Sequence, residues 1–330
     1  MQQLTISVAM CSYNGEKYLQ EQLDSIAKQS RPPDEVIVCD DKSTDQSVSI
    51  LERFSASVTF PVKIFRNDDN LGSTRNFEKA ISLCGGGVIA LADQDDVWKP
   101  NKLETIGNSF SRSPHIGLFF SDANVTDERM SATLYRLWEC VGFDIWTRIK
   151  LLNGNAFDVM LHHNVVTGAT MAFRSDLRKY ILPIPTRWVH DGWIAIVASA
   201  ISEVRPFSER LIDYRQHPNQ QIGTEKKGLI REYLDSQSTT AEGYVTLANQ
   251  YCDVHDRLGL FREEFELGTK LIKIKDKIGH LHARADITGE VGKLYRIALS
   301  ELISLRYFLY SRGIYSFIKD CRSILRVRGR

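Results

Sequence analysis

In IALADQDDVW, residues 89–98, a short apolar run ends in three carboxylates within four positions: Asp93, Asp95 and Asp96. The apolar residues are typical of a buried strand that stops where the charges begin. Like charges this close repel one another, which raises the free energy of the folded chain unless a positive charge lies nearby. The stretch therefore predicts a buried strand whose end carries a cation site.

Strand-like and helix-like segments alternate on both sides of this stretch. The predicted strands of the first part of the chain lie at 4–11, 35–40, 61–65, 88–92 and 116–122. Apolar residues at helical spacing separate them, beginning with Leu19, Leu23 and Ile26. Such alternation indicates βαβ units and a largely parallel sheet with helices on both faces.

The remainder of the chain changes character part-way along. We expect strands at 165–173 and 210–216, a buried helix at 193–201, and only helices after about residue 225. The prediction is an α/β fold with a domain over 1–222 and a helical C-terminal region over 223–330.

Composition excludes several classes of function. The formal net charge is +1, which argues against a dedicated nucleic-acid-binding protein. The six cysteines are scattered without a C-x-x-C pair, so neither a zinc site nor a disulfide framework is indicated, and a cytoplasmic location is expected. No apolar run approaches 18 residues, so we expect no membrane-spanning helix.

Polar residues follow several of the predicted strands: Ser12 to Asn14, Asp40 with Asp41, and Asp93 to Asp96. Ligands of open parallel sheets bind beyond the carboxyl ends of the strands, so these loops predict one shared site. The alternative is that Asp and Asn only serve turns. The loop CSYNG lacks the G-x-G-x-x-G pattern, and no P-loop or EF-hand sequence occurs. A hard cation, Mg²⁺ or Mn²⁺, completed by substrate phosphates, remains as the expected ligand.

Four segments resemble a known enzyme family. They are ISVAMCSYNGEKYLQEQLDSIAKQS (6–30), EVIVCDDKSTD (35–45), RNDDNLGSTRNFEKAI (66–81) and LADQDDVW (91–98). Together they resemble the family 2 glycosyltransferases of the GT-A fold, and with YRQH (214–217) they look most like bacterial rhamnosyltransferases of polysaccharide assembly. The resemblance implies metal-dependent, inverting sugar transfer. The expected donor is a nucleoside-diphosphate sugar, dTDP-rhamnose ahead of a UDP- or GDP-sugar, and the expected acceptor is a saccharide or a lipid-linked saccharide.

The resemblance also assigns donor-binding and metal-binding roles. Asp95 would be the direct metal ligand, and Asp93 would contact the donor ribose or the metal. Asp40 and Asp41 would read the base and ribose. Ser12 and Asn14 would frame the nucleotide, although turn formation at Asn14-Gly15 explains Asn14 equally well. One departure is Lys42, which stands where the family has glycine, so this turn must tolerate a side chain or change shape.

Two of three further residues, Arg75 and His217, have two interpretations each. Arg75 and Arg215 would bind the diphosphate, since a guanidinium suits phosphate geometry, or Arg75 could be an ordinary solvated helix residue. His217 would complete the metal shell or serve a structural role.

The group that activates the acceptor is expected in RWVHDGWIAI (187–196). The resemblance places the family's catalytic base at Asp191, although this carboxylate could also cap the apolar helix that follows. Gly168 would allow the backbone to approach a sugar closely, or would simply be a packing glycine.

The C-terminal stretch 301–330 mixes aromatic and aliphatic residues with seven Lys/Arg against two acids. Such a segment can contact an anionic membrane surface or pack as a helix with a solvated basic rim. Two rival functions remain at this point: a nucleotidyltransferase, and a catalytically silent nucleotide-sugar-binding or scaffold protein that has no use for Asp191.

Overall fold

The structure is a computed structural model, and it describes residues 4–218, 220, 240–287 and 291–328. The chain divides into two compact units, one of Met1–Met160 with Asn164–Lys226, and one of Leu161–His163 with Lys227–Arg330. The predicted boundary near 222–226 lies outside the described residues.

The first unit is built on one mixed sheet. In the described part of the chain it has nine strands in the order β3-β2-β1-β4-β8-β6-β9-β5, with β7 paired to β6. The strands are β1 (Ile6–Ser12), β2 (Glu35–Asp40), β3 (Val62–Arg66), β4 (Val88–Ala92), β5 (Val97–Trp98), β6 (Ile116–Thr126), β7 (Ala132–Arg136), β8 (Met171–Arg174) and β9 (Glu203–Arg215). Strands β1 to β4 are parallel, whereas β8 is antiparallel to both of its neighbours, β4 and β6.

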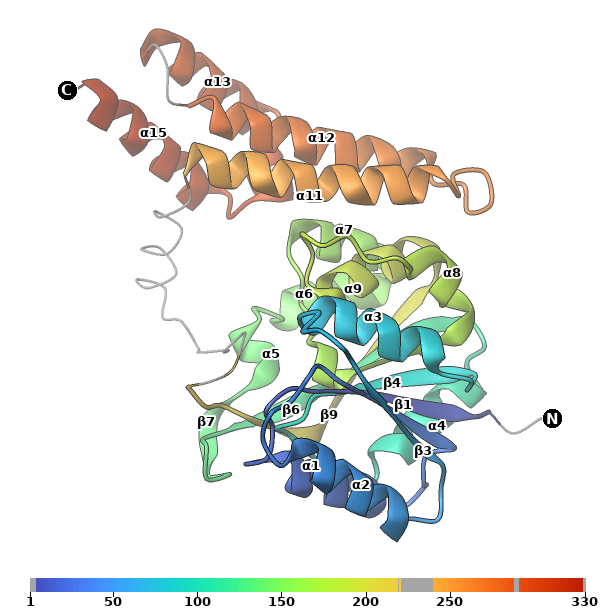
Figure 1. The fold of residues 1–330 in the computed structure, drawn as a ribbon. Coiled ribbons are helices and arrows are strands. Elements are labelled where there is room, and N and C mark those ends of the chain that lie inside the picture. Colours follow the sequence, from blue (N-terminus) through green and yellow to red (C-terminus); the bar gives the residue numbers. More distant parts are fainter. Residues whose placement is uncertain (1–3, 219, 221–239, 288–290, 329–330) are drawn as a thin grey trace. The chain divides into compact units, whose positions relative to one another are not determined.

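Helices cover both faces of this sheet. The helices of this part of the chain are α1 (Leu19–Ala27), α2 (Ser47–Ser57), α3 (Ser73–Leu83), α4 (Lys102–Arg112), α5 (Leu137–Cys140), α6 (Ile145–Lys150), α7 (Ala156–His162), α8 (Arg178–Ile181) and α9 (His190–Ile201). Figure 1 shows α1 and α2 on one face and α3 and α9 on the other. Every residue of β4 is buried, as expected for a central strand covered on both faces.

The sequence correctly predicts β2 and β4 and places the neighbouring strands within a few residues, but it errs in the second half of the unit. The expected strand at 165–173 is only β8, because residues 168–170 form a tight 3₁₀ turn. The Thr167 carbonyl closes this turn by accepting from the Thr170 amide (3.0 Å) and hydroxyl (2.8 Å). Such local bonds compete with a sheet ladder for the backbone.

The described part of the second unit is helical, apart from turns and connections. It contains α11 (Ala241–Gly259), α12 (Gly268–Ala285), α13 (Val291–Ile303), α14 (Arg306–Tyr310) and α15 (Ile314–Arg328). Polar side chains pair with one another in its interior. Arg284 donates two bonds to Asp320, at 2.8 and 2.9 Å, and His280 contacts Glu301 at 2.7 Å. None of the described helices combines the length and apolar composition needed to span a bilayer.

Candidate active site

The loops after β1, β2 and β4 meet at one edge of the sheet. The register pairs Ser12 with Asp40 and Met10 with Ala92, so these three strands end at nearly the same level. Side chains then join the loops: the amide of Gln94 accepts from the Tyr13 backbone N–H (2.8 Å) and donates to the Tyr13 carbonyl (3.1 Å). The acidic stretch 93–96 is thereby fixed to the first loop.

Gly15 makes room for this connection. A Cβ at Gly15 would lie 2.3 Å from Oε1 of Gln94 and 2.6 Å from its Cδ, closer than any real contact. The sequence analysis assigned no role to Gln94, although its place between two aspartates is the signal that could have drawn attention to it.

Asp40 and Asp41 lie at this edge, but their oxygens are engaged in holding the loops. Asp40 accepts from the backbone N–H (3.0 Å) and hydroxyl (2.5 Å) of Ser43. Asp41 accepts from the backbone N–H groups of Leu71 (2.8 Å) and Gly72 (2.9 Å). Direct reading of a base by either carboxylate stays a prediction, and the contacts seen are those of turn formation.

The turn after Asp41 keeps its shape despite the missing glycine. Lys42 adopts a φ of 67°, in the left-handed region that glycine favours, and Nζ contacts Asp69 at 3.0 Å. The turn therefore tolerates a side chain, one of the two expected outcomes.

Ser12 and Asn14 differ in what remains available to a ligand. The Asn14 side chain accepts from the Thr44 backbone N–H at 2.9 Å and so fastens the first loop to the second. The Ser12 hydroxyl is buried and has no hydrogen-bond partner. The Ser12 hydroxyl therefore has no partner within the protein, and the roles of both residues at the nucleotide stay predictions.

Two of the three aspartates, Asp93 and Asp96, have raised pKa values. Burial, followed by the charges of Asp95 and Asp191, raises the pKa of Asp93 to about 7. Burial and the charges of Asp95 and Asp93 raise the pKa of Asp96 well above its usual range. These shifts mean that the crowding expected from the sequence is present in the fold.

A buried lysine offsets part of this negative charge. Lys102 is fully buried, donates to the Ala169 carbonyl at 2.7 Å, and lies over the ring of Trp98 at 3.8 Å from its centroid. Burial lowers the pKa of Lys102 to about 7, and Asp96 and Asp93 act in the opposite direction. The sequence analysis missed Lys102, although its spacing of four and eight residues from the buried Ile106 and Phe110 places it on the inner face of α4.

Asp95 and His217 form the pair that best fits a metal. Oδ2 of Asp95 lies 2.8 Å from Nε2 of His217, and the His217 ring packs on Tyr18 with centroids 4.7 Å apart. Adjacent ligands of an octahedral ion at 2.0–2.1 Å are about 3 Å apart, so this spacing suits Mg²⁺ or Mn²⁺. Within the described residues, no group of three or more His, Cys, Asp or Glu side chains is arranged to hold a metal. An ion at this pair would need its remaining ligands from substrate phosphates and water, and the pair as a metal site stays a prediction.

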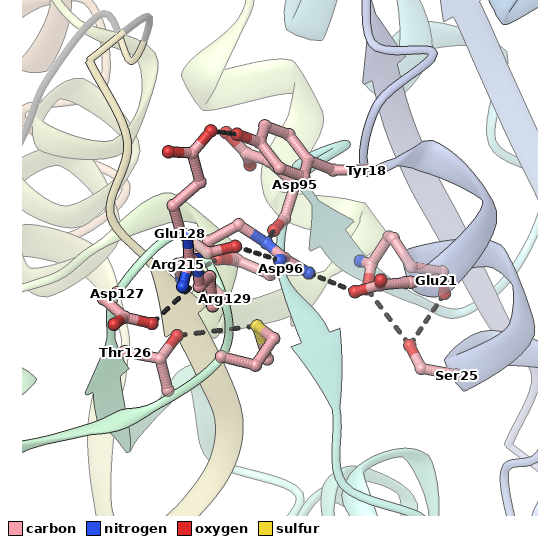
Figure 2. A network of polar contacts seen from close by, with 12 residues as sticks. Tyr18, Glu21, Ser25, Asp95, Asp96, Thr126, Asp127, Glu128, Arg129 and Arg215 are labelled. Carbon is pink, nitrogen blue, oxygen red and sulfur yellow. Dashed lines mark hydrogen bonds and ion pairs between the residues drawn. The ribbon is translucent and has the colours of Figure 1, made fainter.

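Arg215 is held by groups of the protein itself. Its side chain is 3% exposed, and its guanidinium donates to the carbonyls of Asp95 (2.8 Å) and Glu128 (2.8 Å) and to the carboxylate of Glu21. The Arg215 backbone N–H also donates to Asp96 at 3.1 Å. Figure 2 shows this guanidinium surrounded by its acceptors. Each of the three guanidinium nitrogens donates one of these bonds, so Arg215 braces the acidic loop, and its predicted contact with a diphosphate stays a prediction.

Arg75 lies on α3 and pairs with Glu78 at 2.8 Å, with 39% of its side chain exposed. It remains partly accessible, so its predicted contact with the diphosphate stays a prediction.

Asp191 is the second residue of α9, so it is not the helix cap, a position that Val189 occupies. Its carboxylate accepts from the backbone N–H groups of Gly192 and Gly168, the latter at 3.3 Å. Burial raises the pKa of Asp191 to about 6, whereas the two N–H groups act to lower it. Its charge in turn contributes to the raised pKa of Asp93. The fold therefore brings a carboxylate with a base-like pKa close to the acidic loop.

Gly168 allows this arrangement. A Cβ at Gly168 would lie 2.7 Å from Nε2 of His190 and 3.6 Å from Cβ of Asp191. His190 is buried, stacks on Phe77 with ring centroids 4.1 Å apart, and has its pKa lowered to about 3 by burial. The close approach at Gly168 is thus to protein side chains, which agrees with the packing interpretation.

Comparison with known proteins places the chain in a family. Residues 7–181, just over half of the chain, match the family described as "Glycosyl transferase family 2". The chain belongs to this family. An uncharacterized glycosyltransferase of Haemophilus influenzae is 29% identical over 218 residues, which are 65% of this chain and 66% of that protein. An uncharacterized protein of Mycobacterium tuberculosis is 33% identical over 220 residues, 64% of this chain and 59% of that one.

Solved structures share the fold. S. aureus TarS 1–349, in complex with UDP-GlcNAc, superposes with a TM-score of 0.57 at 17% identity, covering 99% of this chain and 91% of that chain. The mannosyltransferase PcManGT from Pyrobaculum calidifontis, in complex with GDP-Man and Mn²⁺, has a TM-score of 0.51 at 15% identity, covering 100% and 87%. The predicted GT-A type of α/β fold with a helical C-terminal region is confirmed.

Proposed function

We propose that this glycosyltransferase moves a sugar from a nucleoside-diphosphate donor to an acceptor hydroxyl, with Asp191 as the base. The observation that carries the proposal is the proximity of two carboxylates, the proposed base Asp191 and Asp93 of the acidic loop. Asp191 has a pKa of about 6, and it lies close enough to Asp93, in the acidic loop, to raise the pKa of that residue. A general base works best when its pKa lies near the working pH.

In the proposed reaction, Asp191 accepts the proton of the acceptor hydroxyl, the hydroxyl oxygen attacks the anomeric carbon, and the nucleoside diphosphate leaves. Attack in line with departure inverts the configuration, as the family resemblance implies. Asp95 and His217, with Asp93 beside them, would hold Mg²⁺ or Mn²⁺. That ion would offset the negative charge of the departing diphosphate. Arg215 and Gln94 keep the acidic loop in position while this happens.

The donor and acceptor belong to the same proposal. Neighbouring structures hold UDP-GlcNAc and GDP-Man, which supports a nucleotide-sugar donor. Relatives include the teichuronic acid biosynthesis glycosyltransferase TuaG of Bacillus subtilis, named as putative, which is 33% identical over 99 residues and supports a role in polysaccharide assembly. Rhamnose as the sugar rests on the resemblance of the sequence alone, as do dTDP as the nucleotide and a saccharide or lipid-linked saccharide as the acceptor.

Two substitutions test the assignment. Asp191→Asn should retain donor binding and reduce transfer by about 10²–10⁴-fold, because only the base is lost. Asp95→Asn should instead weaken donor binding in the presence of Mn²⁺. Binding is measured as a thermal shift against a panel of dTDP-, UDP- and GDP-sugars with and without Mn²⁺. Full activity of Asp191→Asn would end the base assignment, and donor binding without any turnover in the unmodified protein would favour the silent scaffold. Formation of a nucleotide sugar from a sugar phosphate would indicate the nucleotidyltransferase.

A further inference from the structure

The helices α13, α14 and α15 carry an unusual concentration of exposed apolar side chains. We refer to this set as the α13–α15 surface, and its members are at least 39% exposed: Tyr295, Leu299, Ile303, Leu305, Phe308, Leu309, Ile314, Tyr315 and Ile318. In α13 they recur every four residues and so lie along one face. The helices that carry them contact one another within the second unit. Exposed apolar side chains gathered on helices that contact one another indicate an interaction site.

The acidic side chains of residues 301–330 are buried. Glu301 and Asp320 are the two acids of residues 301–330, and they are only 5% and 3% exposed. Glu301 contacts His280 at 2.7 Å and Arg306 at 3.2 Å, and Asp320 accepts two bonds from Arg284. Their charges are therefore neutralised inside the helical unit.

Cations, in contrast, stay at the surface. The side chains of Arg296, Arg312 and Arg322 are exposed on or between the same helices. The exposed part of this segment thus combines aliphatic and aromatic groups with positive charge and offers no exposed carboxylate of residues 301–322.

We propose that the α13–α15 surface binds the surface of an anionic lipid bilayer. The surface of such a bilayer accepts apolar side chains at the level of the acyl chains and cations at the anionic headgroups. It therefore suits both the apolar and the cationic side chains exposed here. A second copy of the chain fits less well. A two-fold dimer sets the same patch against itself, which would bring its exposed cations close to one another.

The test is vesicle flotation of the full-length protein. We expect flotation with vesicles that contain phosphatidylglycerol, little with phosphatidylcholine alone, and at least a tenfold fall in bound fraction when salt rises from 0.1 to 0.5 M. The variant Ile303→Ser, Leu309→Ser, Tyr315→Ser should lower binding at least tenfold. Leu247→Ser, Leu260→Ser, Ile272→Ser removes three exposed apolar side chains of α11, α12 and their connection, and this control should bind like the unmodified protein.

Two results would overturn the proposal. The first is equal flotation of both triple variants. The second is that the unmodified protein binds no vesicles and forms a dimer, seen by light scattering, which only the Ile303, Leu309, Tyr315 variant converts to a monomer. The proposal does not depend on the proposed reaction. Donor-dependent thermal shifts should be the same in both triple variants, so loss of membrane binding and failure of the transferase assignment can be told apart.

Discussion

Replacing Arg215 by methionine tests whether this residue braces the acidic loop or binds the donor. The guanidinium donates to two carbonyls of different loops, at Asp95 and Glu128, and to the Glu21 carboxylate. It also lies over the Tyr18 ring, 4.6 Å from the centroid. Methionine fills a similar volume but offers no donor, so Arg215→Met should leave both carbonyls without these bonds.

The expected loss of stability follows from these contacts. A buried polar group left without its partner costs about 1–3 kcal/mol. Two partly buried carbonyls therefore cost about 2–4 kcal/mol together, if each is taken toward the lower end of that range. The pairing with Glu21 adds little, because the Glu21 side chain is 57% exposed. For a domain whose free energy of unfolding is about 5–15 kcal/mol, this loss is large enough to measure.

Urea unfolding followed by tryptophan fluorescence measures the effect. All five tryptophans lie in the first unit, so their signal reports on that unit alone. With a dependence of about 2 kcal/mol per molar urea, the midpoint should fall by about 1–2 M. The matched control is Arg75→Met, which breaks a 2.8 Å pair of a half-exposed arginine and should cost less than about 1 kcal/mol.

The reasoning is refuted if the two variants unfold at the same urea concentration as the unmodified protein. A raised donor KM with unchanged stability and kcat would instead identify Arg215 as a phosphate ligand. Arg215→Lys keeps the charge but not the forked donors, so it should restore a phosphate contact better than it restores the brace.

Three further predictions concern the site. Gly15→Ala places a Cβ 2.3 Å from Gln94, so it should displace that side chain and lower kcat/KM at least tenfold, whereas Ala at the unobstructed Gly279 should leave kinetics unchanged. Since a base must be deprotonated, and burial raises the pKa of Asp191 to about 6, log kcat/KM should fall with unit slope below about pH 6; a flat profile to pH 5 would contradict the role. Because ionised Asp191 opposes folding above that pH, Asp191→Asn should be more stable at pH 8, by up to about 3 kcal/mol in urea unfolding, and a clear loss of stability would show that its hydrogen bonds outweigh its burial.

The sequence by itself determined the class of fold and the place of the acidic loop. Strand β4 occupies the residues predicted for it, and the acidic loop follows it directly, because an apolar run flanked by polar residues is a local pattern. The first βα units were readable for the same reason, since their helices repeat apolar residues at the helical period. The strand at 165–173 failed where local side-chain bonds of Thr170 replaced the ladder.

The tertiary structure alone decided what each polar side chain does. Arg215 meets Asp95 across 120 positions of sequence, and Gln94 meets Tyr13 across 81. No local pattern encodes such contacts, because they depend on which strand ends the sheet brings together and on which groups burial leaves in need of a partner. For that reason the bonds by which Arg215 braces the acidic loop could not be read from the sequence, and Lys102, unremarkable in the sequence, lies buried near the aspartates.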